Sequence, residues 1–250
     1  MSSLINVPLI IGFYMTISVL VLLYNALYIT VRQRSDAWHQ RLTQRWFKDI
    51  SSQIEKMVSQ PRSSIDAQHK KRLTRKLLHI SQLLGYHSAM QSVAQRFSKA
   101  DVQRYLNQTQ PRFWQLAKRY EQRKDMDKAA FSYVLSQYPP KVSGISTPDA
   151  VLLSFLRGSN TYCRDNTLRA FNAFGDAATV EQAFEILAEH GIFHHEILLA
   201  QDLMTFSGDK KALAVRLWKH ADKWPAHMGA AVVQFIEMSS GDFREVFYEA

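Results

Sequence analysis

The first 31 residues of this chain contain no charged side chain, and residues 5–31 are apolar almost without interruption. An α-helix rises about 1.5 Å per residue, so residues 7–29 are long enough to cross the hydrocarbon core of a bilayer, which is about 30 Å thick. The sequence therefore predicts a membrane span over residues 7–29, within an anchor segment formed by residues 1–31.

A cleavable signal peptide is the alternative for such a segment. Signal peptides have a basic start, an apolar core of about 7–15 residues and a small-residue cleavage site, and none of these is visible here. Arg32, Arg34, Arg41 and Arg45 follow the apolar stretch, whereas no basic residue precedes it. Basic residues beside a membrane segment prefer the cytoplasmic side. We therefore expect a single-pass protein of the cell membrane, with its N-terminus outside and the rest of the chain cytoplasmic.

Charge is distributed unevenly over the rest of the chain. The whole protein carries a net charge of +9, but residues 32–128 hold 21 Lys and Arg against 8 Asp and Glu, whereas residues 131–250 hold 10 against 14. A basic segment close to an anionic leaflet is attracted to it by about 1 kcal/mol per Lys or Arg. The residues that we expect to contact a membrane surface or an acidic partner are Arg32, Arg34, Lys70, Lys71, Arg72, Arg75 and Lys76.

Nucleic acid is the alternative partner for the basic half. Basic residues between positions 112 and 124 alternate with Phe113, Trp114 and Tyr120, as they do on surfaces that hold a phosphate backbone and stack on bases. However, no recognition helix, RNA-binding sheet or zinc-finger pattern accompanies them. We therefore expect lipid or an acidic protein surface rather than nucleic acid.

The apolar pattern predicts helices throughout. Trp38, Leu42, Trp46 and Ile50 recur every fourth residue, so they form one stripe on a helix that continues the anchor without an intervening glycine or proline. A second helix is predicted over about 65–84, with Gly85 ending it, and shorter helices over about 88–98, 111–123 and 126–137. The predicted domains are a basic membrane-proximal region over 32–138, a linker over 139–146 and a repeat region over 147–250.

Paired glycine and aspartate residues give the repeat region its period. Gly-Asp occurs at 175–176, 208–209 and 241–242, a spacing of 33 residues. Glycine suits the left-handed position after a helix, and aspartate caps the helix that follows. A period of 20–50 residues made of helix pairs predicts an α-solenoid. The expected fold is thus all-α: one transmembrane helix followed by a cytoplasmic α-solenoid.

The sequence from Cys163 to Asp176 resembles the second helix of a bacterial HEAT-type repeat, with matches at Arg164, Ala170, Gly175 and Asp176. The next unit keeps Gly208 and Asp209 but has Ile197 where the arginine is expected, and the third has Ala230 there. The resemblance covers residues 147–250 and implies HEAT-like helix pairs. The residues that it implies as builders of the repeats are Arg164, Gly175, Asp176, Gly208, Asp209, Gly241 and Asp242.

Residues 159–166 and 191–196 also resemble segments of membrane-anchored bacterial HEAT-repeat proteins that accompany processive membrane glycosyltransferases of polysaccharide synthesis. That resemblance implies a non-catalytic scaffold or regulatory subunit that binds a membrane partner, with such a glycosyltransferase as the candidate. Two alternatives stay open: a general protein-interaction adaptor in envelope assembly or secretion, and a membrane-tethered domain that is enzymatic or binds nucleic acid.

Motifs for catalysis are missing from the sequence, which contains no phosphate-binding glycine loop, nucleophile elbow or Cys-x-x-Cys pair. The single cysteine, Cys163, forms no intrachain disulfide, and we expect it to be buried. His190, His194 and His195, with Glu196, come nearest to a set of metal ligands, but Gly191 is expected to end the helix between them. We expect no catalytic residue, no metal site and no cofactor.

Overall fold

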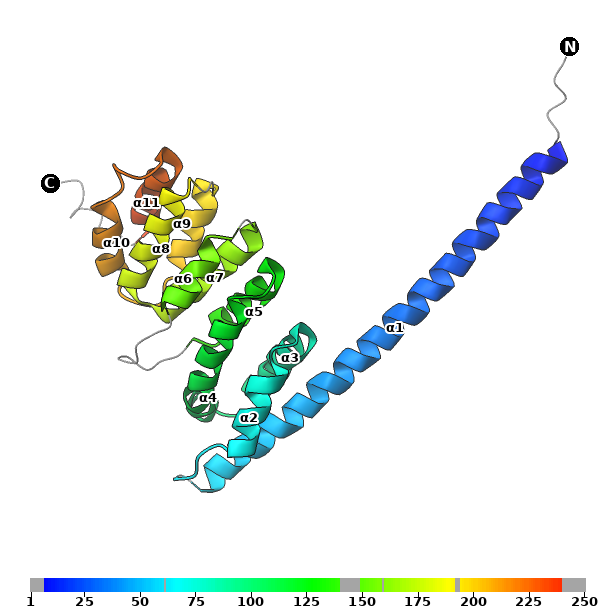
Figure 1. Cartoon of the computed structure of the whole chain (residues 1–250), viewed down its shortest axis with the longest axis horizontal. Helices are drawn as coiled ribbons and strands as arrows, with labels where there is room; N and C mark the ends of the chain where they lie inside the picture. Colours follow the sequence, from blue (N-terminus) through cyan, green and yellow to red (C-terminus); the bar gives the residue numbers. More distant parts are fainter. Residues whose placement is uncertain (1–6, 61, 140–148, 159, 192–193, 240–250) are drawn as a thin grey trace, which may run out of the picture.

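The computed structural model describes residues 7–60, 62–139, 149–158, 160–191 and 194–239. Within these ranges the regular structure is entirely helical (Figure 1). The helices are α1 (Val7–Ser59), α2 (Ala67–Lys76), α3 (Ile80–Arg96), α4 (Lys99–Tyr120), α5 (Asp125–Gln137), α6 (Asp149–Leu156), α7 (Thr161–Phe174), α8 (Ala177–Glu189), α9 (Glu196–Met204), α10 (Lys210–Trp218) and α11 (Ala226–Met238).

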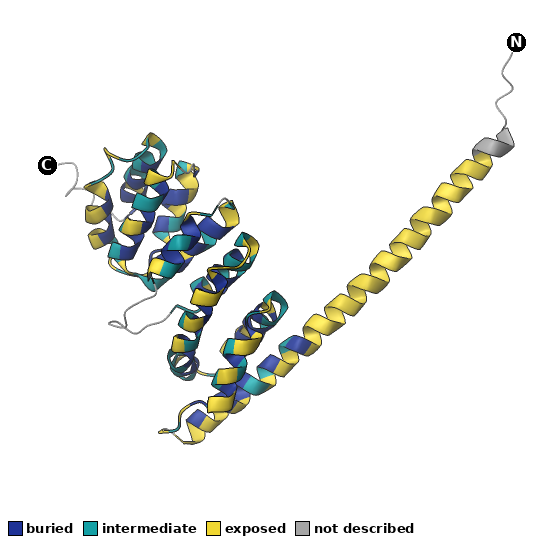
Figure 2. Ribbon diagram, in the orientation of Figure 1, coloured by how far each residue is buried: buried dark blue, intermediate teal, exposed yellow. Residues whose placement is uncertain are grey.

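Helix α1 is continuous over 53 residues, as the absence of glycine and proline between Gly12 and Pro61 predicts. Residues 11–41 are exposed, whereas the second part of the helix buries a stripe that begins at Leu42 and includes Trp46 and Ile50 (Figure 2). By length and composition this helix is apolar enough to cross a membrane, and its most apolar window has no burial within the molecule. Helix α1 therefore consists of an exposed apolar segment and a second segment that packs in the core.

The next two helices lie against the second part of α1 in opposite directions. On α2, Arg72 Nη1 lies 2.9 Å from Asp49 Oδ2. On α3, Gln82 accepts a 3.1 Å hydrogen bond from Trp46 Nε1, and Arg96 Nη2 lies 3.0 Å from Glu55 Oε1. Residue numbers rise together along α1 and α3, so these two helices are parallel.

This alternation continues through the chain and produces two layers. The odd-numbered helices from α1 to α11 pack in chain order in one layer, and the even-numbered helices α2 to α10 pack in order in the other. The resulting stack extends sideways from α1 (Figure 1). Buried apolar residues from Leu42 to Ile236 form one continuous core.

The core also continues across the predicted linker. Helices α5 and α7, on either side of residues 139–146, pack closely, and Ser132 Oγ lies 3.0 Å from Thr167 Oγ1 in their buried contact. In addition, Lys128 Nζ lies 5.6 Å from the centre of the Phe155 ring on α6. The linker itself lies outside the described residues except for Pro139. The two halves of the body therefore share one core.

The predicted helix over 65–84 is wrong in its limits. Residues 77–79 form a turn between α2 and α3, and Gly85 lies inside α3 rather than at a helix end. A Cβ atom at position 85 would lie 2.8 Å from Leu42 Cγ. Glycine is therefore used here for the close approach of α1 and α3, a role that its neighbours in sequence do not indicate.

The predicted helices over 88–98 and 111–123 also need correction, because α4 runs from Lys99 to Tyr120 and has Pro111 inside it. A proline in a helix interior costs about 3 kcal/mol. Burial of apolar side chains on both sides of it offsets this cost, since each contributes about 1.5–3 kcal/mol; they include Tyr105, Phe113 and Leu116.

The turns of the repeat region follow the Gly-Asp pattern in part. Asp176 and Asp209 cap α8 and α10, each accepting two backbone N–H bonds, and Gly175 is left-handed with φ of 76°. Gly208 is not left-handed, so that part of the prediction is wrong. A Cβ atom there would lie 2.2 Å from the Gly175 carbonyl oxygen, which shows that consecutive turns touch through their backbones. Gly241 and Asp242 lie outside the described residues.

We expect Gly208→Ala to lower the free energy of unfolding by about 2–3 kcal/mol, because the new methyl group overlaps the Gly175 carbonyl. Gly191→Ala is the matched control: its φ is 59° but nothing lies within 4 Å of the added atom, so it should cost only about 1–2 kcal/mol. Urea unfolding in detergent, followed by circular dichroism, measures both. An equal or smaller loss for Gly208→Ala would contradict the backbone contact.

Candidate functional site: a basic hollow between α1, α2 and α3

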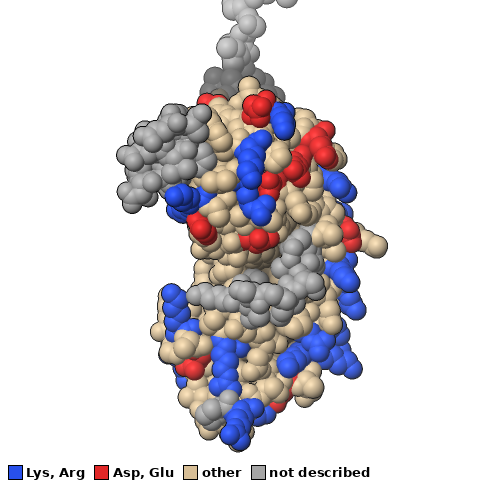
Figure 3. Space-filling model, turned by 90° about the vertical axis from the view of Figure 1, so that its left-hand side faces the viewer, with Lys and Arg blue, Asp and Glu red and all other residues tan. Residues whose placement is uncertain are grey.

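The sequence-predicted basic residues lie in two places. Arg32 and Arg34 are exposed on the free part of α1, whereas Lys70, Lys71, Arg72, Arg75 and Lys76 all lie on α2. Lys and Arg are more numerous than Asp and Glu at the lower end of the molecule, whereas acidic side chains gather towards its upper end (Figure 3). The charge imbalance of the sequence is therefore also an imbalance in space.

The second part of α1, the end of α2 and the start of α3 enclose a hollow of about 70 Å³. We call it the basic hollow; its lining residues are Leu42, Arg45, Trp46, Asp49, Arg72, Lys76 and Gln82. Three cations and one carboxylate give it a positive balance. A wider, more open depression beside it is lined by Gln68, Lys71, Arg72 and Arg75. Cationic side chains that converge in this way suit carboxylate or phosphate groups.

Asp49 organises the hollow. Its Oδ2 atom lies 2.9 Å from Arg72 Nη1 and 3.3 Å from His69 Nδ1, and His69 Nε2 is in turn 2.9 Å from Tyr105 Oη. Burial alone would raise the pKa of Asp49, but the hydrogen bonds and charges of His69 and Arg72 lower that pKa below its ordinary value. Asp49 is therefore ionised and holds Arg72 in place. Within the described part of the chain, Arg45 and Lys76 form no salt bridge, so their charges are available to a ligand.

Among the residues that line the basic hollow, only Arg72 and Lys76 belong to the basic contact set predicted from the sequence. From the sequence, Arg45 is expected only to follow the anchor and Trp46 only to belong to the apolar stripe of its helix, and Asp49 and Gln82 have no predicted role. Arg45 and Asp49 are four residues apart and so share one face of α1, which is a local signal. Their convergence with Lys76 depends on how α2 folds back along α1, which no local pattern reveals.

Two of the three aromatic residues that could stack on bases near positions 112–124 lie in the core. Phe113 and Tyr120 are buried, and the Tyr120 hydroxyl donates a 2.6 Å hydrogen bond to the Leu77 carbonyl. Their rings pack in the core, where Tyr120 stacks on Phe131 with centroids 4.5 Å apart. These two rings are unavailable to nucleic acid.

The histidines at 190–195 are used within the fold. His194 is buried between Asp165, 3.2 Å from its Nδ1, and Arg164, whose Nε lies 3.3 Å from its Nε2. His195 caps α9, and His190 Nδ1 lies 2.9 Å from the Ile186 carbonyl oxygen. Among the residues that the structure describes, no group of three or more His, Cys, Asp or Glu side chains is arranged to hold a metal ion.

The repeat residue Arg164 connects two turns. It is buried, and its Nη1 donates a 2.8 Å hydrogen bond to the Gly158 carbonyl while its Nε contacts His194. It therefore ties the turn before α7 to the turn before α9.

Cys163 beside it is also buried, and burial raises the pKa of its thiol to about 11. At neutral pH this group is a protonated thiol and a poor nucleophile.

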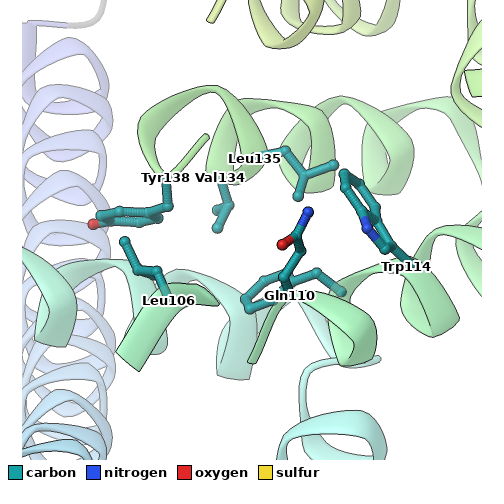
Figure 4. A pocket seen from close by; sticks show the side chains of 7 residues that line it. Leu106, Gln110, Trp114, Val134, Leu135 and Tyr138 are labelled. Atoms are coloured by element: carbon teal, nitrogen blue, oxygen red, sulfur yellow. The ribbon is translucent and has the colours of Figure 1, made fainter. Parts of the chain in front are cut away.

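An apolar pocket between α4 and α5 is too small for a substrate. Its volume is about 20 Å³, close to the space that one water molecule needs. The Gln110 amide lies between Trp114 and Leu135 in this pocket (Figure 4). The basic hollow is therefore the better candidate for ligand recognition.

No family model, no curated protein and no solved structure matches this chain. Its function is therefore argued from its own residues and geometry.

We expect Asp49→Asn to destabilise the protein by about 1–3 kcal/mol at neutral pH, because it removes a charged partner of Arg72 and His69. Since the folded-state pKa of Asp49 is lowered, its stabilisation is complete above its unfolded pKa of about 3.9 and is lost as pH falls through the lower folded value. The difference between wild type and variant should thus shrink in acid. Urea unfolding at several pH values measures it.

Glu55→Gln is the control, because Glu55 forms an exposed ion pair with Arg96 and should change stability by only about 0–1 kcal/mol. Equal effects of the two substitutions would contradict a special role for Asp49.

Proposed function

We propose that this protein is a membrane-anchored α-solenoid of HEAT-like helix pairs that acts as a non-catalytic scaffold or regulatory subunit for a membrane partner. The observation that carries the proposal is the exposure of residues 11–41 of α1, whose large side chains include Leu22, Tyr24 and Leu27 at 67–68 % exposure. Apolar surface left in water is unfavourable by about 25 cal/mol per Å². A bilayer around residues 7–29 removes that cost, and the arginines that follow favour a cytoplasmic body.

Two features support the helix-pair repeat. The odd- and even-numbered helices pack in separate layers in chain order, and Gly175 meets Gly208 one period of 33 residues later. Stacked helix pairs present extended surfaces that suit protein binding.

The position of α2 favours an acidic protein surface over lipid as the ligand of the basic hollow. Asp49, which pairs with Arg72, lies 17 residues beyond Arg32, which is about 25 Å along α1. The headgroup layer is only about 5–8 Å thick, and screening at physiological salt acts over about 8 Å. Lipid charge therefore acts weakly on Arg72, whereas the cytoplasmic part of an integral protein reaches that height.

The partner that we propose is a polysaccharide-synthesising glycosyltransferase of the cell membrane. This part of the proposal rests on the resemblance of residues 159–166 and 191–196 to proteins that accompany such enzymes. The mechanism would be positional: α1 confines the body to the membrane and so raises its effective concentration beside an integral partner.

The anchor is tested by placing two charges in the exposed apolar segment. Leu20→Arg with Leu23→Arg should release the protein from membranes washed with alkaline carbonate, because each arginine costs about 2.5–3.5 kcal/mol at the centre of a membrane helix. Ser35→Arg with Gln40→Arg adds the same charge beyond the span and should leave the protein in the membrane pellet. Release of the wild-type chain by carbonate would overturn the anchor.

The scaffold function is tested by affinity purification of the full-length protein from membranes in mild detergent, with mass spectrometry of the proteins that accompany it. We expect a membrane glycosyltransferase, and we expect its recovery to fall about tenfold in a variant with Arg45→Glu and Lys76→Glu, which reverses two charges of the hollow, since like charges at an interface repel. The control is a variant with Lys99→Glu and Lys211→Glu, which reverses two charges at the starts of α4 and α10, outside the basic hollow.

Recovery of only unrelated proteins would refute the glycosyltransferase partner. Equal recovery with both charge-reversal variants would refute the basic hollow as its binding site.

A further inference from the structure

The helices of the odd-numbered layer that follow α1 all begin at one edge of the body. Ser132 on α5 meets Thr167 on α7, and Arg169 on α7 meets Asp202 on α9, each pair at a similar distance from its helix start. These helices are parallel to α1, so their first residues lie on the side of the body that faces the exposed N-terminal part of α1 (Figure 1). We call this the anchor-side edge; it consists of the ends of α4, α6 and α8, the described residues between them and the next helices, and the first turns of α5, α7 and α9.

Large apolar side chains are exposed along this edge. Tyr162, Met126 and Leu198 are 68 %, 58 % and 58 % exposed, and each lies within the first three residues of α7, α5 or α9. In the described part of the chain after α1, these are the three most exposed large apolar side chains. Ile197, at 45 % exposure, lies beside Leu198. The repetition at three successive helix starts makes this a property of the edge rather than of one loop.

Exposed basic side chains gather on the part of this edge that holds Met126 and Tyr162. They outnumber the acidic residues there, since Glu121 is exposed and Asp125 and Asp127 are partly exposed; the basic ones are Lys118, Arg119, Arg123, Lys124 and Arg157. The end of α8 and the start of α9, beside Leu198, carry Glu189 and Glu196 instead. Apolar and aromatic side chains flanked by Lys and Arg are typical of surfaces that lie in the interface of an anionic membrane.

The anchor sets the height of this edge above the bilayer. Leu42 packs on Gly85, and α3 begins five residues before Gly85, so its start is level with about residue 37 of α1. That level lies about 8 Å beyond Arg32, close to the outer limit of a headgroup layer about 5–8 Å thick. Helices pack about 8–10 Å apart, so α9 lies some 30–40 Å to the side of α1. A tilt of α1 by about 20° towards the side of the stack would bring the start of α9 about 10 Å closer to the bilayer.

We propose that the anchor-side edge lies on the cytoplasmic leaflet, with Met126, Tyr162 and Leu198 in the interface and the basic residues beside Met126 and Tyr162 on anionic lipid headgroups. This inference rests on the proposed membrane anchor and adds a second contact far from it. The body is then held along the membrane surface instead of standing away from it.

Site-directed labelling of the full-length protein in vesicles tests this arrangement. A fluorophore on Tyr162→Cys or Leu198→Cys reports the edge, Lys99→Cys and Lys211→Cys report the opposite helix ends, and Val21→Cys reports the anchor. The native Cys163 is buried and protonated at neutral pH, so it should not take the label. Nitroxide lipids serve as quenchers, in phosphatidylcholine vesicles with and without phosphatidylglycerol.

We expect quenching at positions 162 and 198 to exceed that at 99 and 211 by at least about twofold in anionic vesicles, and to fall without phosphatidylglycerol or with Arg123→Glu and Lys124→Glu. Quenching at Val21 alone would overturn the edge contact but leave the anchor intact. No quenching at Val21 would overturn the anchor, and with it this inference. Protection of positions 162 and 198 only in native membranes would assign the edge to a protein partner and overturn the lipid contact.

Discussion

The packing of α1 against α3 is the contact on which the rest of the molecule depends. Leu42, Trp46 and Ile50 are buried there, and each such side chain contributes about 1.5–3 kcal/mol relative to exposure. The glycine at position 85 lets the two helices approach closely beside Leu42, at the end of this contact nearest the exposed segment. The same helix carries the exposed apolar segment, so the body is joined to that segment without a hinge. The direction of α1 therefore fixes the directions of the helices that pack after it, parallel or antiparallel.

Features that depend on neighbours in sequence could be predicted, whereas those that depend on distant residues could not. The continuity of α1 and the caps at Asp176 and Asp209 follow from local rules, because helix breakers and capping side chains act within a few residues. The reasons for Gly85 and Gly208 lie 43 and 33 positions away, at Leu42 and Gly175. The basic hollow is an intermediate case: its α2 cations were predicted, but their convergence with α1 is a product of folding.

The two proposed contact surfaces differ in chemistry in a way that suits different ligands. The basic hollow combines charge with fixed geometry, because Asp49 holds Arg72 in place while Arg45 and Lys76 keep their charges free of salt bridges within the described residues. The anchor-side edge combines charge with exposed apolar side chains and lacks a comparable enclosed shape. The first arrangement suits a carboxylate-bearing protein surface of defined shape, and the second suits a fluid interface that imposes no fixed geometry.

The unbroken course of α1 also makes the orientation of the body a matter of helical phase. Each residue of an α-helix turns the chain by about 100° and advances it by about 1.5 Å. One residue added between Arg34 and Leu42 would therefore swing the whole stack by more than a quarter of a circle around the anchor. Seven added residues would nearly restore its direction while lifting it by about 10 Å. The length of this short exposed segment therefore sets the direction in which the stack extends from α1, and a change of one residue alters it.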